Sequence, residues 1–174
     1  MSLLTLIQKR CSIRNYLPDS IPTEKLEYIL ESARLAPSAV NYQPWNFLVI
    51  TTEEGRKKVY ECYPREWIKP TPTYIVICGD HSKSWKRASD GKDHLDIDAG
   101  IVTEHICLAA TELNIASCIV CNFDTHLFRN HFNLPEHVEP ITIIPLAYPA
   151  DPELFNTTPK KRKPLEDIII RERF

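Results

Sequence analysis

Residues 95–113, LDIDAGIVTEHICLAATEL, contain the strongest periodic pattern in this chain of 174 residues. One stripe of apolar residues recurs at steps of four and three, which predicts an amphipathic helix. Its members are Leu95, Ala99, Val102, Ile106, Ala109 and Leu113. A second apolar stripe, made of Ile97, Ile101 and Leu108, lies off that face. We therefore expect this helix to be covered on two sides, as a central or interfacial helix is.

Strands and shorter helices alternate around this central helix. Compact apolar runs predict strands at residues 46–51, 73–78, 116–121 and 140–147. Helical periodicity predicts helices at residues 3–10, 22–36, 53–62 and 125–132. The polar residues 79–93 are expected to form a mobile connection. The alternation and the length imply one layered α/β or α+β domain that covers residues 1–174.

The chain ends in a segment that is rich in proline, residues 149–174. This segment has too many prolines for a core element, yet Leu154 and Phe155 are too apolar for a free tail. We expect it to pack as an extended C-terminal arm, for example on another subunit. Residues 164–174 within the arm are predicted to form a terminal helix or strand.

The charge balance argues against several classes of partner. Lys and Arg number 21 and Asp and Glu number 23, a net charge of -2, so the chain lacks the overall positive field that attracts nucleic acid. No apolar run is long enough to span a membrane, and the first ten residues lack the apolar core of a signal peptide. We expect a cytoplasmic protein whose six cysteines are reduced.

Glycine is scarce, and this excludes the common nucleotide-binding motifs. The four glycines are at least nine positions apart. Neither the glycine-rich turn of dinucleotide-binding folds nor the phosphate-binding loop of nucleotide hydrolases can be built with that spacing, and the G-x-S-x-G nucleophile motif is absent too. Any phosphorylated ligand must therefore be held by side chains.

Arg10, Ser12 and Arg14 place two guanidinium groups and a hydroxyl group at a junction between a helix and a turn. This set suits a phosphate monoester, because guanidinium groups form charge-assisted bidentate bonds with phosphate. The alternative is a solvated helix end, where cations complement the negative end of the helix dipole. A second cationic run, residues 160–163, could bind nucleic acid or direct targeting, but such runs are usually solvated surface.

Several short motifs follow one another in a characteristic order. They are KRCSIRNY at 9–16, APSAVNYQPW at 36–45, DAG at 98–100, NFD at 122–124, LPE at 134–136, LAYP at 146–149 and KKRKP at 160–164. In this order the chain resembles the nitroreductase superfamily of FMN-dependent oxidoreductases. The resemblance extends over nearly the whole chain, and the motif at 36–45 is its most specific part.

The resemblance implies an α+β fold, a three-layer sandwich in which helices flank a central mixed or antiparallel sheet. It also implies a homodimer with FMN at the subunit interface, in which the arm at 149–174 is exchanged. The implied cofactor-binding residues of the phosphate and ribityl chain are Arg10, Cys11, Ser12, Arg14, Lys160 and Arg162. Those implied to come from the partner subunit are Pro37, Ser38, Ala39, Asn41 and Gln43, while Cys121 and Asn122 follow the third strand near the flavin.

The chemistry that the resemblance implies is flavin chemistry without a dedicated catalytic side chain. FMN would take hydride from NADH or NADPH and then reduce a small electron acceptor, such as a nitroaromatic compound or a quinone, by a ping-pong mechanism. A second hypothesis is a protein that binds or senses flavin without NAD(P)H turnover, because the cofactor contacts would be shared.

Metal and thiol sites are the remaining alternatives. The residues with the spacing of a zinc knuckle are Cys118, Cys121, His126 and His131. Cys118 and Cys121 lie in an apolar run, and strand residues three apart point to opposite faces, so we expect core thiols rather than a zinc site or a redox pair. His94, Asp96 and Asp98 could likewise be metal ligands, but they suit the polar first turn of the central helix better. Cys11, beside the predicted phosphate site, is a hypothetical reactive thiol.

Overall fold

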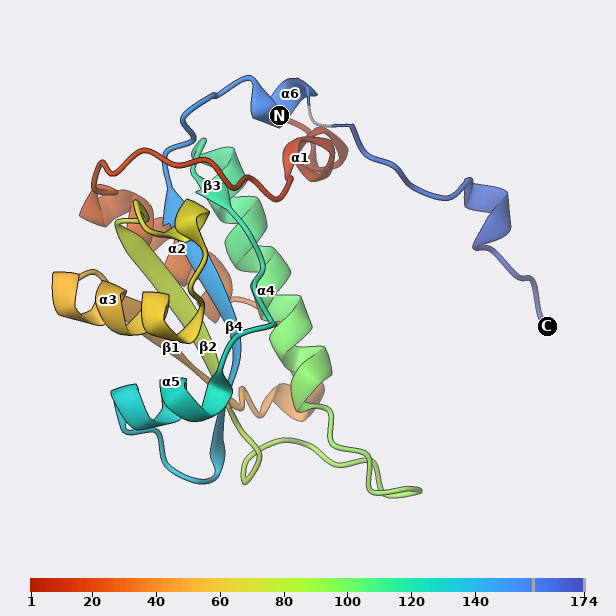
Figure 1. Ribbon diagram of the computed structural model, residues 1–174. Helices are drawn as coiled ribbons and strands as arrows, with labels where there is room; N and C mark the ends of the chain where they lie inside the picture. The colour runs from red at the N-terminus through yellow and green to blue at the C-terminus, as the bar shows by residue number, and fades with distance from the viewer. Residues whose placement is uncertain (158, 174) are drawn as a thin grey trace.

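A four-stranded antiparallel sheet forms the centre of the computed structural model, which describes residues 1–157 and 159–173 (Figure 1). The strands lie in the order β1-β2-β4-β3. Their bounds are Trp45–Ile50 for β1, Thr73–Asp80 for β2, Ala116–Ser117 for β3 and Val138–Ala147 for β4. Every residue of β2 is buried, so this strand lies in the interior with both faces covered.

Helices cover both faces of the sheet and produce three layers. The bounds of the five main helices are Leu3–Lys9 for α1, Thr23–Arg34 for α2, Glu53–Cys62 for α3, Leu95–Glu112 for α4 and Thr125–Phe132 for α5. Side chains alternate between the two faces of a strand. Ile75 and Ile77 therefore pack with α2 and α4, whereas Tyr74 and Val76 pack with α3 and α5. This arrangement confirms the predicted α+β class.

Local capping explains why two helices begin where the sequence predicts. The Thr52 hydroxyl accepts a hydrogen bond from the Gly55 amide at 3.2 Å and caps α3. The Asp124 carboxylate accepts one from the Leu127 amide at 2.8 Å and caps α5, which ends at Asn133 in a left-handed conformation. No helix in the described ranges has both the length and the apolar character needed to cross a membrane.

The predicted strand at 116–121 is wrong in its extent, because only Ala116 and Ser117 form a regular strand. Val120 resumes the pairing and exchanges two backbone hydrogen bonds with Ile143, at 3.0 and 2.9 Å. The Ile143 amide faces β3. Every second peptide group of a strand points to the same side, so the nitrogen of Pro145, two residues further along β4, faces β3 as well. Proline has no amide hydrogen, and the ladder is therefore interrupted opposite Cys118.

The prediction of a terminal helix or strand at 164–174 is also wrong for the residues that the structure describes. Only Leu165–Asp167 form a single 3-10 turn, and residues 161–173 are exposed. Within one chain this part of the arm has no surface to pack on, and Figure 1 shows it leading away from the body. The start of the arm is different, because a short helix α6 (Leu154–Thr157) buries Phe155 against Cys11 and Ile13.

His81 ties the connection between β2 and α4 to the sheet. Its Nδ1 lies 3.0 Å from the Asp93 carboxylate, and its Nε2 lies 2.7 Å from that of Glu139 on β4. These two hydrogen bonds raise the pKa of His81, with a smaller opposing effect from burial. The fold therefore favours the protonated imidazole.

We expect this contact to make folding stability depend on pH. A raised pKa in the folded state means that the stabilisation is complete below the unfolded value of 6.5 and declines as pH rises through the higher folded value. Since the His81 side chain is 45% exposed, we expect each ion pair to contribute less than about 1 kcal/mol. Thermal unfolding should show H81A less stable than the unmodified chain at pH 5.5, with a smaller difference at pH 8.5. H126A, at an exposed position, is the control, and an equal difference at both pH values would contradict the prediction.

Candidate functional site

The segment from Arg10 to Arg14 runs beside β3 as an extended chain. Ser12 forms a parallel bridge with Ser117, and the Ile13 amide donates to the Ser117 carbonyl oxygen at 3.2 Å. Because the segment is extended, its side chains alternate, with Cys11 and Ile13 buried and Ser12 and Arg14 exposed. The sequence pattern thus places a hydroxyl group and a guanidinium group on one accessible surface.

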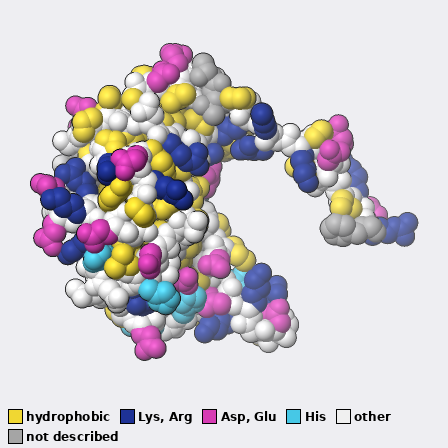
Figure 2. All heavy atoms as spheres, in the orientation of Figure 1, with side chains coloured by type: hydrophobic (Ala, Val, Ile, Leu, Met, Phe, Trp, Pro, Cys, Tyr) yellow, Lys and Arg dark blue, Asp and Glu magenta, His cyan; other side chains and the backbone are white. Residues whose placement is uncertain are grey.

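Three cationic side chains gather at the end of α1. We call Arg10, Lys160 and Arg162 the cation cluster. The Lys160 ammonium group donates a hydrogen bond to the Arg10 carbonyl oxygen across a sequence separation of 150 residues. Burial lowers the pKa of Lys160, and the charges of Arg10 and Arg162 lower it further. Figure 2 shows Lys and Arg side chains where the arm leaves the body.

Among the residues that the structure describes, one carboxylate forms an ion pair with the cation cluster. The Arg10 Nε is 3.7 Å from a Glu104 oxygen on α4, and the Arg10 side chain is 14% exposed. A single carboxylate does not neutralise three cations, so the cluster keeps an excess of positive charge. A phosphate group, with its two negative charges and several acceptor oxygens, matches that excess.

Trp67 positions Arg14 and was not identified from the sequence. The Arg14 guanidinium carbon lies 5.9 Å from the centre of the Trp67 ring, a cation–π distance. Tyr16 and Tyr63 each pack edge-on against Trp67, with ring centres 5.8 Å apart. Trp67 is about fifty residues from Arg14 in the chain, so no local pattern could have linked the two.

The cysteines divide into buried and accessible thiols. The Cys11 side chain is buried and its thiol donates to the Leu154 carbonyl oxygen at 3.5 Å, so it faces the interior rather than the surface that carries Ser12 and Arg14. Burial raises the pKa of Cys118, and Arg14 and Ser12 only partly offset that effect. Cys121 is exposed. Cys118 is thus a core thiol, as the apolar run predicts.

The residues with zinc-knuckle spacing do not form a metal site. The His131 Nε2 lies 2.7 Å from the Glu61 carboxylate, so its partner is Glu61 and not a metal ion shared with the two cysteines. Asp96 and Asp98 are also separated, because Asp96 is exposed and Asp98 is buried. Across residues 1–157 and 159–173, no three His, Cys, Asp or Glu side chains are grouped so that they could hold a metal ion.

Residues 36–44 form a surface loop with an unusual backbone, which we call the amide loop. Val40, Asn41 and Gln43 have φ values of 54°, 58° and 50°. Such a conformation costs about 1–3 kcal/mol for a residue other than glycine, and Val40 is β-branched, which makes it the least suited of the three. The loop is fixed internally, since the Gln43 amide donates to the Ser38 hydroxyl oxygen at 2.8 Å.

The amide loop leaves its polar side chains accessible. Asn41 and Gln43 are exposed, and the Gln43 side-chain amide donates to the Asn41 side-chain oxygen at 3.2 Å. Pro37 is exposed too, whereas Ser38 and Ala39 are half-buried. The Ala39 amide of the loop donates to the Asp98 carboxylate in the first turn of α4, and Asp98 is roughly 9 Å of helix rise from Glu104. One chain therefore places the cation cluster and the amide loop at different points along the same helix.

Cys121 and Asn122 occupy the segment between β3 and α5, and both are exposed. The Cys121 thiol contacts the Thr142 hydroxyl group on β4 at 3.8 Å. The bridge between Ser12 and Ser117 brings the start of this segment beside residues 10–14. The structure thus gathers Arg10, Ser12, Arg14, Lys160 and Arg162, with the segment of Cys121 and Asn122 adjoining them along the chain.

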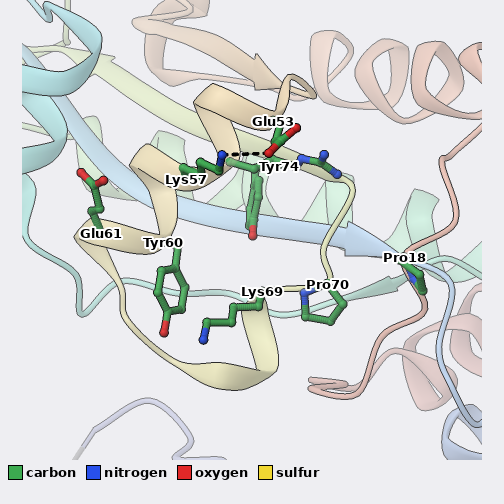
Figure 3. A pocket seen from close by; sticks show the side chains of 9 residues that line it. Pro18, Glu53, Lys57, Tyr60, Glu61, Lys69, Pro70 and Tyr74 are labelled. Carbon is green, nitrogen blue, oxygen red and sulfur yellow. Dashed lines mark ion pairs between the residues drawn. The ribbon is translucent and has the colours of Figure 1, made fainter.

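A separate surface cavity of about 530 Å³ lies beside α3 (Figure 3). None of the residues predicted for the cofactor site lines it. Its lysines already have carboxylate partners, since Lys57 pairs with Glu53 at 2.8 Å and Lys69 with Glu66 at 2.9 Å. The cation cluster, with its excess charge, is the better candidate site.

Comparison with known proteins identifies the family. The model of the nitroreductase family matches residues 7–74 and 59–148, so the chain belongs to the nitroreductase family. A relative from Archaeoglobus fulgidus, whose name places it among the NADH dehydrogenases/NAD(P)H nitroreductases, is 33% identical over 98% of both chains. The crystal structure of a nitroreductase family protein from Clostridium difficile 630 has a TM-score of 0.87 and 40% identity, and it covers all of both chains.

The description of a further similar structure names a cofactor, FMN. The protein is an FMN-dependent nitroreductase from Clostridium difficile R20291, with a TM-score of 0.78 and 25% identity. The match covers 99% of this chain and all of that one. These similarities confirm the resemblance that the short motifs indicate.

Proposed function

We propose that this chain is an FMN-dependent oxidoreductase that takes hydride from NADH or NADPH and reduces small electron acceptors, such as nitroaromatic compounds or quinones, in a ping-pong cycle. The observation that carries the proposal is the convergence of Arg10, Lys160 and Arg162 at one surface. Membership of the nitroreductase family and the names of the relatives support the same activity.

The residues present fit FMN. The cation cluster has one carboxylate nearby and an ammonium group whose pKa is lowered, so a bound phosphate would relieve repulsion among the cations. Four glycines cannot provide a backbone cradle, which makes side-chain binding of the phosphate necessary. FMN, when bound, supplies a ring that accepts hydride from a reduced nicotinamide and then passes the electrons to the second substrate.

The tasks of the protein are binding and orientation. Arg10, Lys160 and Arg162 would hold the phosphate, and Ser12 and Arg14 would bind the ribityl chain. Asn122 and Cys121 would lie beside the flavin ring. Cys11 is part of the phosphate-binding segment, and its side chain would pack on the interior side of that segment. The amide loop of the partner subunit, with Pro37, Ser38, Ala39, Asn41 and Gln43, would complete the site. No side chain is required to act as nucleophile or general base.

Dimer formation through α4 is part of the proposal. Ile97 is 47% exposed on α4, and a Cβ atom at Gly100 would meet no atom within 4 Å. Glycine within a helix costs about 1 kcal/mol relative to alanine, and one chain alone gives no reason for that cost. The close approach of a second chain would explain it. The exposed apolar residues of the arm would be covered by exchange in the same dimer.

The six free cysteines support a reducing compartment, so we propose a cytoplasmic enzyme. The test is direct. The purified protein should bind one FMN per chain, lose its yellow colour when NADH or NADPH is added without oxygen, and regain it with a quinone or nitroaromatic compound.

Other outcomes of this experiment would contradict the proposal. A yellow protein that neither nucleotide reduces would be a flavin-binding protein without turnover. A protein that binds no FMN would contradict the cofactor assignment. Analytical ultracentrifugation should show a dimer at micromolar concentration, and a stable monomer would contradict the shared site.

A further inference from the structure

Asp98 in the first turn of α4 is a buried carboxylate that neither a salt bridge nor helix capping explains. Its exposed fraction is 1%. One oxygen, Oδ1, accepts a hydrogen bond from the Ala39 amide of the amide loop at 2.9 Å. The other, Oδ2, is buried and has no hydrogen-bond partner among the residues that the structure describes.

The hydrogen bond from Ala39 to Asp98 lies directly before the strained part of the amide loop. Ala39 directly precedes Val40 and Asn41, two of the three residues with positive φ. At the far end of the loop, the Pro44 carbonyl oxygen accepts from the Asp80 amide at 2.8 Å. The strained residues are thus held between two fixed points, one at Asp98 and one at Asp80.

Stability does not account for a carboxylate at this position. Burial of a charged group with one oxygen unpaired is unfavourable for folding. The start of α4 has other acidic groups, because Asp93 accepts from the Leu95 amide at 2.8 Å and the exposed Asp96 lies in the first turn. Asp98 is therefore not needed as a helix cap or for the helix dipole.

We propose that Asp98 is a positioning residue for the cofactor site. Its carboxylate holds the Ala39 amide, and the amide loop thereby keeps the left-handed conformations that present the Asn41 and Gln43 side chains. The inference rests on the proposed function, since these side chains serve the flavin of the partner subunit. Asp98 itself does not touch the cofactor in this proposal.

The test compares two substitutions of Asp98 with a matched control. D98A removes the acceptor, D98N keeps a side-chain oxygen, and D96A removes an exposed carboxylate from the same helical turn. Fluorescence titration should show FMN binding about tenfold weaker in D98A, within about threefold of wild type in D98N, and unchanged in D96A. The visible absorption band of D98A saturated with FMN should be displaced, because the loop amides no longer contact the ring in the same way.

A second variant removes the donor and leaves Asp98 intact. Ser38 has an extended backbone, with φ of -135° and ψ of 163°, which is compatible with proline at position 39. A39P lacks the amide hydrogen and should reproduce the weaker binding and the displaced band of D98A. The double variant D98A/A39P should be no weaker than either single one, because both break the same contact. This variant also keeps the test valid if D98A folds poorly.

The outcomes separate this inference from the proposed function. If the wild type binds FMN but D98A and A39P bind it with wild-type affinity and spectrum, the positioning role is wrong and the proposed function stands. Losses that add in the double variant, or a failure of D98N to restore binding, would also contradict the positioning role. If the wild type binds no FMN, the proposed function fails and the inference fails with it.

Discussion

Replacing both Arg10 and Lys160 by alanine is expected to weaken FMN binding by about a thousandfold. A hydrogen bond between charged groups contributes about 1.5–3 kcal/mol, which is about a ten- to hundredfold change in affinity for each side chain. The two cations interact, since the charge of Arg10 lowers the pKa of Lys160, so the effects of the two substitutions are not expected to be additive. Titration of the apoprotein with FMN, followed by quenching of flavin fluorescence, measures the change.

The matched control removes two other cations, both from the arm. K161A/K163A changes the net charge by the same amount, and both of these lysines are exposed. We expect this control to change FMN affinity by less than about threefold at physiological ionic strength, because exposed charges are screened. An equal loss in both double variants would mean that the general charge of the arm matters and that the cation cluster is not a specific phosphate site.

The second large effect concerns the fold. Phe128 on α5 is fully buried, and its ring centre lies 5.8 Å from that of Phe123 and 4.5 Å from that of Phe132. F128A should lower the free energy of unfolding by about 3–5 kcal/mol, because it removes a buried ring and leaves a cavity. Urea unfolding of FMN-free protein, at one fixed protein concentration, measures this change without a contribution from cofactor binding.

L35A is the control for F128A. Leu35 is 64% exposed at the end of α2, so its replacement should change the unfolding free energy by less than about 0.5 kcal/mol. A loss below about 1 kcal/mol for F128A would mean that α5 does not pack on the sheet in solution as the structure places it.

The sequence predicts the helices more accurately than the strands, and the reason is the range of the interactions. The starts of α3 and α5 depend on Thr52 and Asp124, whose side chains accept hydrogen bonds from amides three residues further along the chain. The extent of β3 depends instead on Pro145, which is distant in the sequence but adjacent in the sheet. A prediction from local patterns includes the first kind of contact and omits the second.

The candidate site shows the same limit. The sequence places Arg10, Ser12 and Arg14 in one short segment, but the approach of Lys160 came only from the resemblance to a family. The contacts of Trp67 with Arg14 and of Asp98 with Ala39 were missed, because each joins segments that are distant in the sequence. The apolar residues at 164–174 predict a regular element, yet one chain provides no surface on which it could form.

The short β3 strand also affects how the protein behaves at high concentration. An edge strand with free peptide groups can recruit the edge of another molecule and start aggregation. Here two residues form the regular edge, the missing amide of Pro145 interrupts the ladder behind it, and the bridge from Ser12 occupies Ser117. This side of the sheet therefore offers no continuous template for intermolecular β-sheet growth, which favours solubility while the chain folds and before it meets its cofactor.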